Sequence, residues 1–299
     1  MDVFVTGASG YIGSAVARVL LARGHRVRGL ARSDTAEATV RAVGATPVRG
    51  GLTDLAVLAA AAAAGDAVVH TAASTGDDRP EIDAAAVSAM LGAMAGGAFV
   101  GTSGAPRTRS SRVPILEEDT AEPVGPLAWL ADAETRVLTA DRVRAAVVRP
   151  PIVYGDGGGP VAGLVRQARA DGAARYVDTG ANCWSTVHVT DLAEAYALIL
   201  ESGATGVFHA AEASPVAMSE LFSAVGAAAD VPVMSWPLTE ALATHGPLAG
   251  FLAMDAALDA GRLRALGWTP GFGDALGGIS GALRNPAQRY AREALGLMP

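Results

Sequence analysis

A strand-like segment that runs into three spaced glycines constrains the fold of this chain more than any other feature. Val3 to Thr6 is mostly apolar and mostly β-branched, and a helical pattern begins near residue 11. The segment that joins them and opens the helix is Gly7, Ala8, Ser9, Gly10, Tyr11, Ile12 and Gly13. In such a turn the first glycine permits a sharp bend, the second lets the backbone approach a pyrophosphate, and the third lets the helix pack closely on the strand. Free N–H groups at the helix start favour the anion. The segment predicts a dinucleotide site.

The first half of the chain repeats this alternation. Strands are expected at 3–6, 27–30, around 48, 67–71, 98–101 and 145–148, and helices near 11–23, 35–43, 53–64, 81–95 and 127–140. Alternating strands and helices predict a parallel sheet covered on both faces. We therefore expect an α/β protein: a Rossmann-type doubly wound parallel sheet over residues 1–150. A smaller, mainly substrate-binding domain is expected over 151–299, with some segments returning to the sheet.

The end of the second expected strand indicates which nicotinamide cofactor would bind. An NAD site places an acid there to accept hydrogen bonds from the ribose 2′-hydroxyl. Here Ala31 occupies that place and is followed by Arg32 and Ser33. Arg32 can bind a 2′-phosphate with its forked guanidinium, and Ser33 can donate to it. The sequence thus favours NADPH (NADP⁺), although a shifted alignment would bring Asp34 to the ribose instead.

Composition narrows the class of partner. The formal net charge of −7 argues against a nucleic-acid partner, which would require a basic face. The single cysteine, Cys183, excludes a disulfide framework, and the scattered histidines show no metal-ligand spacing, so no metal site is expected. The N-terminal segment lacks the basic region of a signal peptide. We expect a cytoplasmic protein, monomer or homodimer, with a small-molecule substrate and no membrane contact.

All 23 basic residues are arginines, so the chain contains no lysine. This excludes a Schiff base on lysine, a phosphate-binding loop lysine and any Tyr-Lys proton relay. Arginine does not replace lysine in these roles, because its guanidinium stays protonated in proteins.

Further motifs are spread along the chain. They are Gly50-Gly51-Leu52-Thr53-Asp54, Val69-His70-Thr71-Ala72-Ala73, Arg149-Pro150-Pro151-Ile152-Val153-Tyr154-Gly155, Val187 to Ala193, and Leu266 to Pro270. Together with the glycine turn, this set resembles the extended short-chain dehydrogenase/reductase family, which is epimerase/dehydratase-like. The resemblance implies cofactor contacts from residues beyond the glycine turn: Leu52, Thr71, Ala72, Ala73, Thr102, Pro150, Pro151, Ile152 and Val153.

The catalytic residues of that family do not appear at the matching positions. The family has a serine after the fifth strand and a Tyr-x-x-x-Lys on the next helix; here Gly104 stands at the serine place. The family spacing places Trp129 and Ala133 at the tyrosine and lysine positions. Anchoring the alignment on Glu134 places Pro126 and Leu130 there instead. The chain therefore resembles the atypical members of the family, which lack the Ser-Tyr-Lys set.

Without the relay, reduction of a ketone would depend on positioning and on stabilising the developing alkoxide. Ser103 and Thr102 are the candidates for orienting the carbonyl, with Ser74 and Gly104 beside the substrate and a proton from water or from the substrate itself. Trp129 and Trp184 could sandwich a flat polycycle. The alternative is that both indoles are ordinary core packing.

These observations predict an NADPH-dependent ketoreductase for a hydrophobic, polycyclic aromatic polyketide. Two alternatives remain: a non-catalytic NADPH-binding sensor or regulator, and a redox-neutral epimerase or dehydratase.

Overall fold

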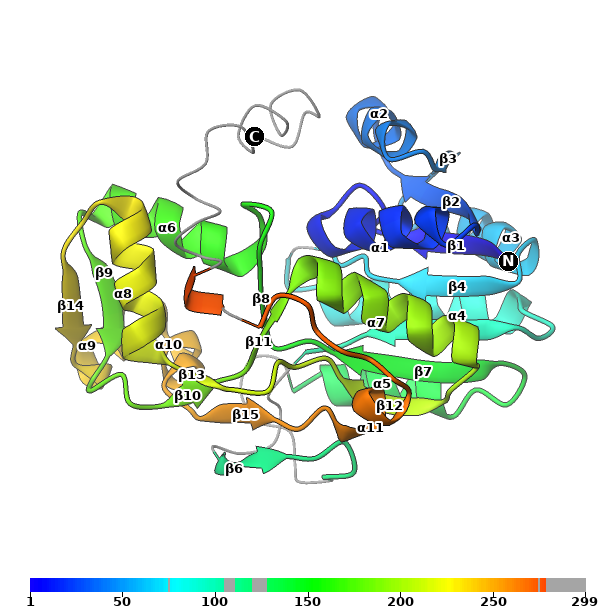
Figure 1. Cartoon of the computed structure of the whole chain (residues 1–299). Coiled ribbons are helices and arrows are strands. Elements are labelled where there is room, and N and C mark those ends of the chain that lie inside the picture. Colours follow the sequence, from blue (N-terminus) through cyan, green and yellow to red (C-terminus); the bar gives the residue numbers. More distant parts are fainter. Residues whose placement is uncertain (75, 105–110, 120–127, 274, 278–299) are drawn as a thin grey trace.

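The structure is a computed structural model that describes residues 1–74, 76–104, 111–119, 128–273 and 275–277. It shows two lobes side by side, with the N-terminus in the larger one (Figure 1). Seven strands form the sheet of the larger lobe in the order β12-β7-β5-β4-β1-β2-β3, and every neighbouring pair is parallel. This confirms the predicted Rossmann-type α/β fold. The strands are β1 (Asp2–Thr6), β2 (Arg26–Ala31), β3 (Thr46–Arg49), β4 (Ala67–His70), β5 (Ala98–Thr102), β7 (Arg144–Arg149) and β12 (Gly206–His209).

Helices cover both faces of this sheet. Its strands carry apolar side chains on both faces, and the helices bury them. Val3, Val5 and Val69 pack into a core with α1 and α7, whereas Phe4 and Val68 pack into a second core with α3 and α4. The helices of this lobe are α1 (Tyr11–Ala22), α2 (Asp34–Ala42), α3 (Leu55–Ala63), α4 (Arg79–Ala93), α5 (Leu130–Leu138), α7 (Val189–Ser202) and α11 (Gly261–Ala265). Nowhere in the described part of the chain does a helix have the length and apolar character needed to span a membrane.

The smaller lobe contains the remaining sheets, ordered β13-β10-β15-β6, β11-β8 and β14-β9. Its strands are β6 (Ser111–Ile115), β8 (Ile152–Tyr154), β9 (Ala174–Val177), β10 (Cys183–Trp184), β11 (Thr186–His188), β13 (Val216–Ala217), β14 (Val233–Trp236) and β15 (Ala256–Leu258). Its helices are α6 (Gly159–Asp171), α8 (Met218–Ala229), α9 (Leu238–His245) and α10 (Pro247–Leu252). The chain crosses between the lobes repeatedly: β12 returns to the large sheet, whereas β6 leaves it to pair with β15.

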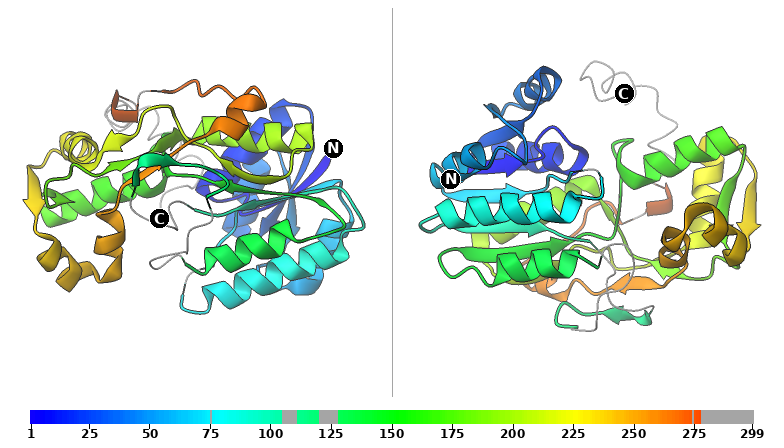
Figure 2. Two further views of the ribbon diagram at one scale, coloured as in Figure 1. Left: turned by 90° about the horizontal axis from the view of Figure 1, so that it is seen from below. Right: turned by 180° about the vertical axis from the view of Figure 1, so that it is seen from behind.

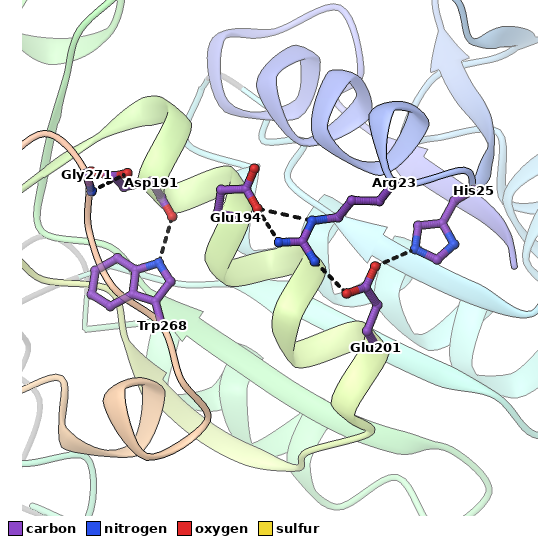
Figure 3. A network of polar contacts seen from close by, with 7 residues as sticks. All are labelled: Arg23, His25, Asp191, Glu194, Glu201, Trp268 and Gly271. Atoms are coloured by element: carbon purple, nitrogen blue, oxygen red, sulfur yellow. Dashed lines mark hydrogen bonds and ion pairs between the residues drawn. The ribbon is translucent and has the colours of Figure 1, made fainter.

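Charged side chains fasten α7 to the end of α1 (Figure 3). The guanidinium of Arg23 contacts the carboxylate of Glu194 and lies 2.6 Å from that of Glu201, which is also 2.8 Å from the His25 ring. At the other end of α7, Asp191 accepts hydrogen bonds from the backbone N–H groups of residues 271 and 272. The helix is therefore held at both ends between the sheet and the C-terminal part of the chain.

Candidate functional site

The glycine turn forms a cradle that only glycine can line. Gly7 has a φ of +72°, and a Cβ built on it would lie 2.8 Å from the backbone nitrogen of Ala72. A Cβ on Gly13 would lie 2.1 Å from the carbonyl oxygen of Gly7. Gly10 precedes α1 without a side-chain cap, so the N–H groups at the helix start face outward for an anion. The cradle thus fits the pyrophosphate of a dinucleotide.

The second wall of the cradle comes from the end of β4. Thr71 donates its hydroxyl to the Thr6 carbonyl at 2.7 Å, and the Ala72 N–H donates to the Thr6 hydroxyl at 3.3 Å. His70 continues this chain of contacts, with Nδ1 2.8 Å from the Thr6 hydroxyl and Nε2 3.1 Å from Asp83. Residues 6, 7 and 70–72 are thereby fixed against each other. Ala73, in contrast, is exposed.

Arg32 and Ser33 follow β2 at the sheet edge. Arg32 is exposed and forms no ion pair with any described residue. Ser33 accepts a hydrogen bond from the Ala36 N–H at 3.2 Å and so caps α2, which leaves its hydroxyl hydrogen available to donate. Asp34, the alternative ribose ligand, instead pairs with Arg49 at 2.6 Å. The end of β2 therefore offers a cation and a hydroxyl.

The remaining predicted cofactor residues lie at two places. Leu52 packs against the core on the α3 side of the sheet. Pro150 and Pro151 are buried, and β8, which includes Ile152 and Val153, pairs with β11.

Tyr11 connects the cradle to the segment after β8. Its hydroxyl donates to the Gly155 carbonyl at 2.8 Å. A Cβ on Gly158 or Gly159 would lie 2.4 or 2.3 Å from the Tyr11 ring. The first turn of α1 thus holds the β8–α6 loop against the cradle, a contact across 144 residues that the sequence pattern does not reveal.

Two serine hydroxyls stand out at the carboxyl ends of β4 and β5. The Oγ atoms of Ser74 and Ser103 are buried and have no hydrogen-bond partner among the described residues. Buried hydroxyls are normally hydrogen-bonded, so such a pair is unusual. The strands β4 and β5 are neighbours, with His70 opposite Gly101, so both serines leave the same edge of the sheet.

Thr102 is engaged within the protein. Its hydroxyl donates to the His70 carbonyl at 2.7 Å, and the Tyr196 hydroxyl lies 2.6 Å away and must then be the donor of that contact. Burial raises the pKa of Tyr196, so this hydroxyl keeps its proton. The Thr102 hydroxyl therefore links β4, β5 and α7 within the protein, and its role toward a substrate stays a prediction.

The two tryptophans predicted to flank a substrate have different surroundings. Trp129 is half-buried at the start of α5, with the Arg79 guanidinium carbon 5.1 Å from its ring centroid. Trp184 is 4% exposed, belongs to the core of the smaller lobe, and donates its indole N–H to the Met254 carbonyl at 2.8 Å. This matches the core-packing alternative for Trp184. Gly104 is half-buried beside Ser103, and residue 126 lies outside the described residues.

A buried polar network behind the site was not predicted from the sequence. Arg149, at the end of β7, makes a two-pronged ion pair with Glu134 of α5 at 2.9 and 2.7 Å. The same guanidinium lies 3.4 Å from the ring of His209. The backbone N–H of His209 donates to the Glu117 carboxylate. Burial, together with the Arg149 charge, lowers the pKa of His209 to about 4. The ring is therefore neutral near pH 7.

A second buried carboxylate joins the lobes. Glu212 accepts hydrogen bonds from the hydroxyls of Tyr154 and Thr186, both at 2.8 Å, and from the His188 N–H at 3.2 Å. Burial raises the pKa of Glu212. The only sequence signal for either network is a charged residue within an apolar pattern.

The smaller lobe also contains a cavity of about 200 Å³ between α6, β9, α8, α9 and α10. Its lining is mainly apolar and includes Leu164, Phe222, Trp236 and Leu252.

The chain is similar to solved structures over nearly its whole length. The human epimerase family protein SDR39U1, solved with NADPH, gives a TM-score of 0.76 at 21% identity, covering 95% of this chain and 100% of that one. The dTDP-glucose 4,6-dehydratase DesIV of Streptomyces venezuelae, solved with NAD and TYD bound, gives 0.79 at 22% identity, covering 99% and 98%. At these identities the likeness shows a shared fold.

Several proteins have higher sequence identity to this chain than these solved structures. A Schizosaccharomyces pombe protein of uncharacterised activity is 34% identical over 280 residues, 90% of this chain and 95% of the relative. The 2-alkyl-3-oxoalkanoate reductase of Stenotrophomonas maltophilia is 30% identical, over 78% of this chain and 77% of that enzyme. A ketoreductase of Stigmatella aurantiaca, whose named substrate is 4-hydroxy-2-methyl-3-oxo-4-farnesyl-3,4-dihydroquinoline-1-oxide, is 31% identical, over 72% and 70%. A profile of the NAD dependent epimerase/dehydratase family matches residues 3–92. Together with the glycine cradle and the sheet order, these similarities show that the chain belongs to the NAD-dependent epimerase/dehydratase family of extended short-chain dehydrogenases/reductases.

Proposed function

We propose that this protein is an NADPH-dependent ketoreductase for a hydrophobic, polycyclic aromatic ketone of the polyketide type. The observation that carries the proposal is the pair of buried serine hydroxyls, Ser74 and Ser103, which have no hydrogen-bond partner among the described residues and follow the ends of β4 and β5. Two relatives, which are 30% and 31% identical to this chain, are named as a reductase of 2-alkyl-3-oxoalkanoates and as a ketoreductase. Their names support ketone reduction as the reaction class.

The cofactor residues are proposed from the cradle and from the end of β2. Gly7, Gly10 and Gly13 would admit the pyrophosphate, while Arg32 and Ser33 would bind the 2′-phosphate that distinguishes NADPH from NADH. Arg32 suits this role because no described carboxylate neutralises it. When bound, the nicotinamide supplies the hydride.

The serines would stabilise the substrate oxygen. A buried hydroxyl left without a partner costs about 1–3 kcal/mol, which a substrate carbonyl accepting a hydrogen bond would recover. The same donor gains strength as negative charge develops on that oxygen, and one such donor is commonly worth about 2.7–4 kcal/mol of barrier. Ser103 is the stronger candidate, because its backbone N–H is fixed on the Val148 carbonyl at 2.8 Å. The proton would come from water or from a phenol of the substrate.

The substrate class is the finer part of the proposal. The half-buried Trp129 offers an aromatic face to such a substrate. In lacking the Ser-Tyr-Lys set, the chain also resembles the angucyclinone ketoreductase of simocyclinone biosynthesis. We therefore propose an angucyclinone-like substrate and a role in antibiotic biosynthesis in the cytoplasm.

The test mixes the protein and NADPH with a panel of aromatic polyketide ketones and follows the nicotinamide absorbance. Ser103→Ala should lower kcat by about 10²-fold, the typical effect of removing one oxyanion donor. The matched control is Ser223→Ala, an exposed serine on α8. NADPH binding without turnover of any ketone would refute the reductase and favour the sensor. Equal losses in both variants would refute the role of Ser103.

A further inference from the structure

Arg79 is an arginine with no charged partner among the described residues, and it lies at the start of α4. It opens α4, nine residues after the last residue of β4 (His70) and five residues after Ser74. Its guanidinium carbon lies 5.1 Å from the ring centroid of Trp129, the residue that precedes α5. The helices α4 and α5 run side by side on the same face of the sheet (Figure 2, left), so this pair bridges their first turns.

The Nε–H group of Arg79 is not satisfied within the described part of the protein. Its Nε atom is buried and has no hydrogen-bond partner there, and no described carboxylate forms an ion pair with it. Arg149 shows the usual arrangement, since Glu134 takes two of its N–H groups. A guanidinium has five N–H donors and keeps its charge at any physiological pH. The ring of Trp129 attracts the cation but accepts none of these bonds in the plane of the guanidinium.

Three buried donors without a described partner follow the ends of two adjacent strands. The Oγ atoms of Ser74 and Ser103 and the Nε of Arg79 are all buried without a partner in the described residues. They lie in segments that leave the carboxyl ends of the adjacent strands β4 and β5. In open parallel sheets this edge is where ligands bind. The serines are suited to a neutral oxygen, whereas the fork of Arg79 is suited to a carboxylate.

We propose that Arg79 and Trp129 bind an aryl carboxylate, with the guanidinium on the carboxylate and the indole against the ring. This inference rests on the proposed function and narrows it: the ketone substrate is an acidic aromatic compound, anchored by its carboxylate at Arg79 while its carbonyl faces the serines. In this arrangement Trp129 contacts the aromatic ring by itself, without Trp184 on the other face of the ring.

The test compares two ligands with the same ring system and nearly the same shape, of which only the first is charged: 2-naphthoate and 2-naphthamide. Their binding to the full-length protein saturated with NADP⁺ is measured by isothermal titration calorimetry. Arg79→Gln should weaken 2-naphthoate about tenfold, equivalent to about 1.4 kcal/mol, and should change 2-naphthamide by less than about twofold. The matched control is Arg136→Gln, because Arg136 lies on α5 and contacts Ser88 of α4 at 3.5 Å. Both ligands should bind this control as they bind the wild type.

Three results would overturn the assignment. The first is an equal loss of both ligands in Arg79→Gln, which would mean that the arginine only packs on Trp129. The second is a loss of NADP⁺ affinity in that variant with charge selectivity unchanged, which would place a cofactor phosphate at Arg79. The third is no binding of 2-naphthoate to the wild type. Because the readout is binding, failure of turnover on every ketone with carboxylate selectivity intact would refute the proposed reductase alone.

Discussion

Replacing Glu134 by glutamine removes one charge of a buried ion pair and keeps the shape of the side chain. The carboxylate of Glu134 is 6% exposed and the guanidinium of Arg149 is 14% exposed. Two hydrogen bonds of 2.9 and 2.7 Å join them, one to each carboxylate oxygen. Glutamine retains one acceptor, so the variant leaves a buried cation with one neutral hydrogen bond in place of two charged ones.

The cost follows from this geometry. Removing one partner of a buried pair typically costs about 3–5 kcal/mol, because the other charge stays buried without compensation. The retained acceptor and the partial exposure of Arg149 place the expected loss near the lower limit, about 3 kcal/mol. Replacing both residues by apolar ones, Glu134→Leu with Arg149→Met, removes the uncompensated charge and should cost less than about 1 kcal/mol.

Urea unfolding at pH 7 measures these differences. The single variants Glu134→Leu and Arg149→Met complete a double-mutant cycle with the double variant, and a coupling free energy of at least about 2 kcal/mol is expected for residues in direct contact. A loss below about 1 kcal/mol in Glu134→Gln would refute the reasoning, as would a double variant as unstable as the sum of the single ones. Either result would show that water compensates the Arg149 charge.

Two further predictions concern the cofactor and pH. Arg32→Ala should weaken NADPH far more than NADH, because only NADPH carries the 2′-phosphate; equal losses in equilibrium binding would end that assignment. For His209, burial depresses the folded-state pKa to about 4 from an ordinary 6.5. The stability it contributes is therefore complete above pH 6.5 and is lost as the pH falls towards 4, by at most about 3 kcal/mol. His209→Asn should remove this component when the urea midpoints of the two proteins are compared from pH 7 to 4. Parallel curves would contradict the neutral, buried ring.

The sequence predicted the large sheet well because its signals are local. A short apolar run bounded by a turn marks a buried strand whatever lies across the sheet, and the ends of β1, β2 and β5 differ from the expected ones by at most one residue. The glycine cradle is local too, because the positive φ of Gly7 and the contact between Gly13 and the Gly7 carbonyl arise within seven residues.

The contacts of individual side chains cannot be predicted in this way, because residues distant in the sequence decide them. Thr102 and Ser103 are neighbours and both carry hydroxyls, so the sequence treats them alike. Only the fold brings Tyr196 to Thr102 and leaves Ser103 without a described partner. The surroundings of Trp129 and Trp184 differ for the same reason. The carbonyl that accepts the indole hydrogen of Trp184 belongs to a residue 70 positions away in the sequence.

The absence of lysine has a clearer meaning once these partners are known. Two of the described arginines show this: Arg149 is paired with Glu134, and Arg79 lies on Trp129. A guanidinium holds its proton at all relevant pH values, so each can fix a charge and neither can pass a proton. On the proposed mechanism the protein therefore contributes orientation and hydrogen bonds from the serines. The proton must then enter from water or from the substrate, which favours substrates that carry an acidic group next to the ketone.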